Sequence, residues 1–375
     1  MKSKLAILKS ISIMVLISSC IFIVKATEKI DYQVIVKIRT EGLKHSQVMK
    51  VAQYLTDLYG PRVAHSPSYN EALHWAVKKF KSWGIEKVAI EPWGKIGLGW
   101  ENQFTSVHMI SPRYMPIIAY PLAWTAGTKG RIKASTVYVN TNELYTPNDL
   151  NQYRGRLKGK IILLKPKRKL KLNFKPDAVR LSQEELEDMA SLQIIKSPEM
   201  ISVPRETMDK LLSGESKLKK RILSEEKIEE FFRREGAVVL VEPGMGADTM
   251  DKGTVRVNDR QPITPDDPIP LPHLVMAAEH YNRLMRLMEM GYEVKMDVEI
   301  RNEFYNDDLK DYNLIAELPG SDLQDEIVMI GAHLDAKSAG TGATDNAAGS
   351  AVVMEAMRIL KAIDAKPRRT IRAAL

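Results

Sequence analysis

Apolar and polar positions follow a helical rhythm near the start of the chain. In 46–59, and again from Ser68, apolar residues recur every three to four positions, which is typical of amphipathic helices. The second helix opens with capping-box spacing at 68–71 and is expected to stop at Gly84, before a short apolar strand at 88–90. A helix–helix–strand unit leaves apolar faces uncovered, so we expect it to pack on a sheet formed later in the chain.

From about residue 97 the apolar runs shorten and are separated by Gly, Pro and Asn, which predicts β-strands joined by turns. Strands are expected at 136–139, 160–164, 237–241, 274–276, 294–300 and 314–318, with a helix at 277–290. The stretch 154–176 carries ten Lys or Arg and no acid. Because like charges repel and only Phe174 is available there for base stacking, we interpret this stretch as a solvated loop rather than a polyanion site.

The last part of the chain combines a strand, a glycine-rich loop and a helix. The apolar run 327–331 predicts a buried strand of a parallel or mixed sheet. Gly340 and Gly342 lie in the loop that follows, and apolar residues then recur at helical spacing in 346–363. In open α/β sheets, ligands bind in the crevice formed by loops that leave the carboxyl ends of strands. The polar residues of this unit are therefore the candidates for chemistry.

Three polar residues of this unit form a candidate zinc site. His333 and Asp335 follow the strand, and Asp345 lies at the entrance of the helix. Zinc can take one nitrogen and one oxygen ligand from such a set, while the third group holds the imidazole ring. Each residue also has an ordinary structural explanation as the alternative: Asp345 as a helix cap, His333 as a core histidine and Asp335 as a turn residue. No Gly-Lys-Ser/Thr follows the glycines, which argues against a phosphate-binding loop.

The order H-L-D, then a glycine-rich loop and G-A-T-D-N-A-A-G before a helix, resembles a family of zinc aminopeptidases. That family contains bacterial leucyl aminopeptidases, glutamate carboxypeptidase and carboxypeptidase Q. The stretches 55–93, with L-Y-G-P-R, and 270–312, with L-P-H-L-V-M-A-A-E-H-Y-N-R-L, are similar to its secreted carboxypeptidase Q-like branch. The resemblance implies an α/β fold, with a zinc-exopeptidase-type mixed sheet flanked by helices, incomplete here, and an inserted, mainly β protease-associated domain.

The resemblance also implies a division of the chain into domains. We expect a signal peptide at 1–26, the N-terminal part of the peptidase domain at 27–110, a protease-associated-like insert at 111–293, and the first part of the zinc peptidase core at 294–375. In the family, the general-base glutamate, an acidic ligand beside it and two further ligands come later than the position of Leu375. We therefore expect the chain to be truncated within the peptidase domain.

Residue roles follow from the same resemblance. His333 and Asp345 are expected to bind metal, with Asp345 bridging two zinc ions, and Asp335 is the expected catalytic residue that orients the histidine. The peptide bond after Asp345 is expected to be cis in the complete enzyme. One departure lies beside these residues, since this chain has Ala336-Lys337-Ser338 where the branch usually carries Ser-Trp-His.

These roles imply a secreted zinc-dependent exopeptidase that hydrolyses peptides or dipeptides with a metal-activated water. The choice between aminopeptidase and carboxypeptidase Q-like action stays open, as does assembly into a homodimer. Without the missing general base, we expect the chain as it stands to be inactive. The alternatives are a non-catalytic binding protein and a fragment of an interrupted peptidase gene.

The N-terminus and the composition limit the location and the partners. Basic residues before the apolar run 11–24, followed by Val-Lys-Ala, predict a signal peptide and a secreted or periplasmic protein without a membrane span in the mature chain. Lipid attachment at Cys20 is less favoured, because the apolar run continues past it. Cys20 is the only cysteine, so zinc is limited to nitrogen and oxygen ligands. Four lysines of 1–26 account for half of the formal charge of +8, and the remaining +4 is too mild for nucleic acid.

Overall fold

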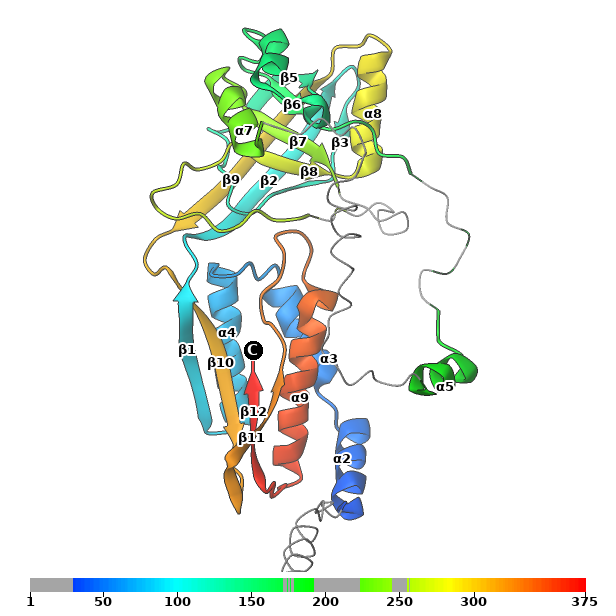
Figure 1. Ribbon diagram of the computed structural model, residues 1–375, viewed down its shortest axis with the longest axis vertical. Helices are drawn as coiled ribbons and strands as arrows, with labels where there is room; N and C mark the ends of the chain where they lie inside the picture. The colour runs from blue at the N-terminus through cyan, green and yellow to red at the C-terminus, as the bar shows by residue number, and fades with distance from the viewer. Residues whose placement is uncertain are drawn as a thin grey trace, which may run out of the picture.

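Two sheets organise the residues that the structure describes. The computed structural model describes residues 30–170, 179–191, 223–244 and 257–375, together with the single residues 174, 176 and 255. One sheet has four strands in the order β1-β10-β12-β11, and the other has eight in the order β3-β2-β9-β5-β6-β7-β8-β4. Each sheet carries its own helices, which gives a four-stranded lobe and an eight-stranded lobe (Figure 1). The predicted signal peptide at 1–26 and Cys20 lie outside the described residues.

The four-stranded lobe is a mixed sheet flanked by helices, as predicted. Its strands are β1 (Lys87–Lys95), β10 (Lys310–Leu318), β11 (Leu323–Gly331) and β12 (Arg369–Ala374). β10 pairs antiparallel with β1 and with β12, whereas β11 and β12 run parallel. Its helices are α2 (Tyr32–Lys44), α3 (Val48–Gln53), the π-helical turn η1 (Tyr54–Leu58), α4 (Pro67–Ser82), a second π-helical turn η4 (Ala343–Ala347) and α9 (Ala348–Ala362).

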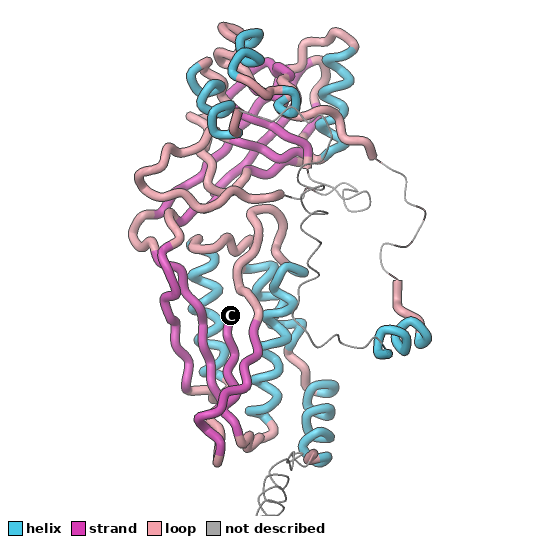
Figure 2. The backbone as a smooth tube through the Cα atoms, viewed as in Figure 1, coloured by secondary structure: helices cyan, strands magenta, loops and turns pink. Residues whose placement is uncertain are grey.

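The core of this lobe lies between the sheet and helices α3, α4 and α9 (Figure 2). The apolar stripes predicted for the first helices point into this core. Leu55 and Phe80 are fully buried there, together with Leu314 of β10 and Met354 of α9. The helix–helix–strand unit therefore packs on a sheet whose other strands come more than two hundred residues later, as its uncovered apolar faces required.

Helix α4 begins earlier than its sequence pattern predicted. Ser66, not Ser68, caps the helix, because the Ser66 hydroxyl oxygen accepts a hydrogen bond from the Tyr69 amide at 3.1 Å. Pro67 then occupies the first turn, where a missing N–H removes no helical hydrogen bond. Ser68 instead donates its hydroxyl to Glu101 at 2.8 Å. The capping-box spacing was therefore coincidental, and the proline marks the boundary.

The apolar run 327–331 forms a strand, but the prediction that it is buried was wrong. β11 is the edge strand of the four-stranded sheet and has β12 as its one neighbour there. Ile327, Val328 and Met329 are 46%, 46% and 59% exposed. An apolar run predicts a strand, but the position of that strand in the sheet depends on pairing partners elsewhere in the chain.

The eight-stranded lobe is a sheet covered on both faces. Its strands are β2 (Gly99–Ser111), β3 (Met115–Pro116), β4 (Ala119–Pro121), β5 (Ile132–Tyr138), β6 (Ile161–Leu163), β7 (Val239–Pro243), β8 (His273–Met276) and β9 (Lys295–Tyr305). Its helices are the 3-10 turns η2 (Thr141–Glu143) and η3 (Pro147–Tyr153), with α7 (Glu225–Arg234) and α8 (Ala278–Glu289); α5 (Gln183–Ser191) lies apart from the sheet (Figure 1).

Alternation along β6 shows how the two faces are filled. Ile161 and Leu163 pack in the cluster that contains α8, while Ile162 and Leu164 pack in the cluster that contains α7. β5, β6, β7 and β8 run parallel to one another. A parallel strand with helices on both faces is apolar at every position, which explains the continuous apolar run in the sequence.

The chain passes between the lobes at two adjacent places. β2 pairs antiparallel with β9 over its whole length, and both strands belong to the eight-stranded sheet. The predicted strand at 294–300 therefore does not return to the first lobe but extends this sheet as far as Tyr305. The division into domains at 110 and 294, and the identity of the eight-stranded lobe as a protease-associated domain, stay predictions.

Candidate metal centre

The predicted site residues lie at one edge of the four-stranded sheet. The loop 332–342 leaves the carboxyl end of β11, beside the end of the parallel strand β12, and leads through η4 into α9. A cleft of about 660 Å³ opens at this edge. Its walls include His333 and Asp335 of the loop, Tyr69 of α4, Asp311 of β10, and Pro262 from the eight-stranded lobe. The cleft thus has walls from both lobes.

The structure brings His333, Asp335 and Asp345 together. The Nδ1 atom of His333 lies 2.9 Å from Oδ1 of Asp335, and its Nε2 atom lies 2.9 Å from Oδ1 of Asp345. All three side chains reach solvent, being 52%, 43% and 72% exposed. When Nδ1–H donates to Asp335, the Nε2 lone pair faces the Asp345 carboxylate, which is how a histidine ligand is oriented beside a second ligand.

The donor set fits zinc in type but is small. One nitrogen and one carboxylate are ligands that zinc accepts, while a structural or catalytic zinc takes at least three protein ligands. Among the residues that the structure describes, no group of three or more His, Cys, Asp or Glu is arranged to hold a metal ion. The described part of the chain therefore offers two ligand groups and one carboxylate that orients the first of them.

Backbone geometry before α9 places Asp345. Asp345 and Asn346 have non-helical dihedral angles inside η4, and the peptide bond between them is cis, as the resemblance implied. Gly342 has a positive φ of 62°, and a Cβ there would lie 2.3 Å from the Cβ of Ala336. Only glycine fits this position, because any side chain would collide with the other end of the same loop.

Arg62 fixes the loop 332–342 from its buried side, a role that was not predicted. Its fully buried guanidinium donates to the carbonyl oxygens of Leu334 at 2.7 Å, Thr341 at 3.0 Å and Gly342 at 3.2 Å, and also to that of Leu55. Burial lowers the pKa of Arg62, while the nearby Asp335 opposes that shift. The one signal in the sequence was its place in the L-Y-G-P-R stretch that carries the resemblance.

Asp259 of the eight-stranded lobe ties down the part of the loop that departs from the family pattern. Its carboxylate accepts hydrogen bonds from the Ser338 amide at 2.8 Å and the Ser338 hydroxyl at 2.5 Å. The Ala123 amide donates to the same carboxylate at 3.1 Å. Ser338 therefore anchors the loop to the other lobe, a role that no local sequence pattern indicated.

The deep end of the cleft contains a second acidic residue. Asp311 is 6% exposed and accepts a hydrogen bond from the Tyr312 amide at 2.9 Å. Burial raises the pKa of Asp311, and the charge of Asp335 raises it further. Tyr69 donates its hydroxyl to the Tyr312 carbonyl at 2.5 Å, and burial raises the pKa of that hydroxyl above its usual range. Asp311 thus favours its neutral form more than an exposed aspartate does.

Comparisons with known proteins identify the type of fold. Residues 313–375 match peptidase family M28. Carboxypeptidase Q of Bos taurus is 21% identical over 341 residues, 91% of this chain and 60% of that protein, and carboxypeptidase Q of Homo sapiens is 20% identical over 343 residues with the same shares. The crystal structure of a peptidase M28 precursor from Shewanella amazonensis has a TM-score of 0.56 at 23% identity, covering 92% of this chain and 66% of that one. The chain thus has the fold of that protein and spans about 60% of the length of the curated relatives it matches.

Proposed function

We propose that this chain, whose residues 313–375 match peptidase family M28, supplies zinc ligands of a metallo-exopeptidase centre that acts on peptides or dipeptides. The observation that carries the proposal is the position of His333, with one ring nitrogen facing Asp335 and the other facing Asp345. The proposed zinc ligands are His333 Nε2 and the Asp345 carboxylate, and the family site holds two zinc ions.

Each residue has a distinct task in this centre. A bound zinc ion supplies Lewis acidity toward the scissile carbonyl and an attacking water. Asp335 accepts a hydrogen bond from the Nδ1–H of His333, which keeps the Nε2 lone pair directed outward. Arg62 fixes both ends of the loop through the carbonyl oxygens of Leu334 and Gly342, so the two proposed ligands keep their separation. The cleft beside them gives a substrate access from solvent.

The described residues do not include an obvious general base. The carboxylates among the described residues that line the cleft are those of Asp311 and Asp335. Asp335 is engaged with His333, and Asp311 is buried and accepts a hydrogen bond from the Tyr312 amide. A positioned acid–base group typically contributes about 10²–10⁴-fold to rate. We therefore expect residues 27–375 alone to hydrolyse peptides very slowly or not at all. The lack of a positioned base among the described residues also favours the alternative of a non-catalytic binding protein.

Export is the second part of the proposal. The basic start, the apolar run 11–24 and the small residues after it support a signal peptide and a secreted or periplasmic location. None of the helices in the described ranges is long and apolar enough to cross a membrane. Mass spectrometry of the protein recovered from the medium or periplasm tests this, since cleavage should leave Thr27 as the first residue. An intact N-terminus, or a lipid on Cys20, would contradict it.

Zinc titration tests the proposed centre. We expect metal-free residues 27–375 to bind zinc weakly in isothermal titration calorimetry, because they bring two ligands together where about three or four are typical. His333→Ala and Asp345→Asn should abolish this binding, and Asp335→Asn should weaken it about 10–100-fold. His74→Ala is the matched control, since His74 is an exposed histidine of α4 outside the cleft. Equal zinc affinity in His333→Ala and His74→Ala would refute the site.

A further inference from the structure

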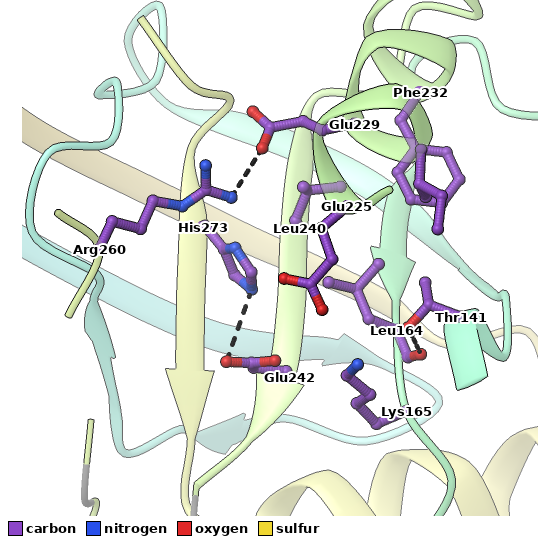
Figure 3. A pocket seen from close by; sticks show the side chains of 11 residues that line it. Thr141, Leu164, Lys165, Glu225, Glu229, Phe232, Leu240, Glu242, Arg260 and His273 are labelled. Atoms are coloured by element: carbon purple, nitrogen blue, oxygen red, sulfur yellow. Dashed lines mark hydrogen bonds and ion pairs between the residues drawn. The ribbon is translucent and has the colours of Figure 1, made fainter. Parts of the chain in front are cut away.

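A second pocket lies in the eight-stranded lobe, far along the chain from the candidate metal centre. It encloses about 70 Å³ between helix α7 and the sheet (Figure 3). Lys165 follows the end of β6 and Glu242 lies near the end of β7, so the pocket is at the carboxyl edge of parallel strands, where α/β sheets bind ligands. A wider groove of about 1010 Å³ shares Lys165, Glu242 and His273 with it.

His273 is the unusual residue of this pocket. Its side chain points into the pocket from β8 and is 6% exposed (Figure 3). Neither ring nitrogen has a hydrogen-bond partner among the described residues. The nearest acid is Glu242, whose Oε1 atom lies 4.0 Å from Nε2, which is longer than a hydrogen bond. Buried polar groups are nearly always paired, so two unpaired nitrogens on one buried ring indicate an absent partner.

The charge state of His273 limits what that partner is. Burial lowers the pKa of His273 to about 3, and the charges of Arg260 and Lys165 act in the same direction. The ring is therefore neutral at physiological pH, with one N–H donor and one lone pair to offer. Burial also raises the pKa of Glu242, which means that its carboxylate lacks the solvation it would have in water. A cationic hydrogen-bond donor between them would pair with the Glu242 carboxylate and with one of the two ring nitrogens of His273.

The other charged residues that line the pocket are Arg260, Glu229, Lys165 and Glu225, and each of them already has an interaction. Arg260 donates to Glu229 at 2.6 Å, and Glu229 also accepts a hydrogen bond from the Leu271 amide at 2.6 Å. Lys165 donates to Asn142 at 3.3 Å and lines both the pocket and the wider groove. Lys165 is therefore placed to receive a negative group on a ligand whose positive group lies deeper, beside His273 and Glu242.

We propose that this pocket binds a small molecule with a primary ammonium group and a carboxylate, the chemistry of a free α-amino acid. The ammonium donates to Oε1 of Glu242 and to the lone pair of His273 Nε2; a nitrogen about 2.9 Å from each fits their 4.0 Å separation. The carboxylate faces the Lys165 ammonium at the mouth. A metal ion fits less well, because no third His, Cys, Asp or Glu among the described residues completes the pair.

Calorimetric titration of residues 27–375 with glycine tests the proposal, with methylammonium and acetate as single-group probes. Glycine should bind saturably, methylammonium more weakly and acetate not at all. Glu242→Gln should weaken glycine binding by more than about 10-fold, because it removes a charge-assisted hydrogen bond. His273→Leu should do the same. Glu230→Gln is the matched control, since Glu230 is an exposed glutamate of α7.

Three outcomes would overturn the proposal. One is the absence of saturable glycine and methylammonium binding to the folded protein, with folding shown by circular dichroism. Another is equal glycine affinity in Glu242→Gln and Glu230→Gln. A crystal structure in saturating glycine that holds only a water molecule between His273 and Glu242 would also refute it. Because the readout is binding in the eight-stranded lobe, the result does not depend on peptidase activity.

Discussion

His333 and His273 occupy opposite kinds of environment in the two lobes. His333 is half exposed at a sheet edge, and both of its ring nitrogens face carboxylates at 2.9 Å. His273 is buried in the other lobe, and neither of its ring nitrogens has a partner among the described residues. The first arrangement presents a histidine that is oriented by the protein toward solvent. The second presents a buried, neutral ring in a small pocket, and no donor among the described residues pairs with its lone pair.

The difference teaches that the surroundings of a histidine decide its chemistry more than its proximity to acids does. Both rings have a glutamate or aspartate nearby. Around His333, hydrogen bonds fix the ring so that an incoming cation meets an ordered nitrogen. Around His273, burial removes the proton and leaves hydrogen-bonding capacity without charge. A metal suits the first site and an ammonium group suits the second.

The largest effect should come from removing the support of the His333 loop. Arg62→Met should lower the free energy of unfolding by about 3 kcal/mol or more, because several hydrogen bonds from one buried charge are lost together and their carbonyl acceptors stay buried. Zinc binding should be lost as well, since the loop no longer fixes His333. Urea unfolding and zinc titration measure the two effects.

Arg113→Met is the matched control, because Arg113 is exposed in a loop of the other lobe. It should change the free energy of unfolding by less than about 0.5 kcal/mol. An Arg62→Met protein as stable as this control, with unchanged zinc affinity, would show that the loop is held by something other than the guanidinium.

A smaller effect should appear in the pH dependence that comes from His273. Its pKa is lowered to about 3 in the folded protein, against about 6.5 in the unfolded chain. Below pH 6.5 the unfolded chain therefore binds a proton that the folded protein does not. The stability associated with the neutral ring is fully present above pH 6.5 and is lost as the pH falls toward 3. Between pH 7 and pH 5 this loss is about 2 kcal/mol.

Comparison with His273→Leu isolates this contribution, because all other titrating groups stay in place. Urea unfolding of both proteins at pH 7 and pH 5 should show the wild type losing about 2 kcal/mol more than the variant. Arg260 and Lys165 lower the pKa of His273 together with burial, and the nearby Glu242 carboxylate lies 4.0 Å from Nε2. Parallel curves for the two proteins would mean that the ring is protonated, or solvated, in the folded state.

The sequence indicated what is local and missed what is not. His333, Asp335 and Asp345 were predicted together because they fall within one strand–loop–helix unit, whose geometry follows from short-range patterns. Arg62 contacts Leu334 across 272 positions of sequence, and Asp259 contacts Ser338 across 79. No periodicity or motif specifies such contacts, since they arise only once the two lobes and their helices have packed.

The same limit explains the remaining differences. The elements were largely found, including the helix at 277–290 and the strands at 237–241 and 274–276, because apolar spacing reflects local structure. The pocket around His273 is built from separate stretches of the chain, so the sequence showed this histidine only within the L-P-H-L-V-M stretch that carries the resemblance. The prediction that 327–331 is buried was wrong, because sheet order, not hydrophobicity, decides which strand lies at the edge.

The smallest effect should come from the exposed strand beside His333. Val328→Thr keeps the shape of the side chain and adds a hydroxyl, so on an exposed edge it should change the free energy of unfolding by less than about 0.5 kcal/mol. Val298→Thr in β9 is the matched control, because Val298 is fully buried in the eight-stranded lobe. Burying an unpaired hydroxyl there should cost about 1–3 kcal/mol. Urea unfolding of the two variants compares the open edge that carries His333 with the closed core of the eight-stranded lobe. A cost at Val328 equal to that at Val298 would mean that β11 is covered in solution.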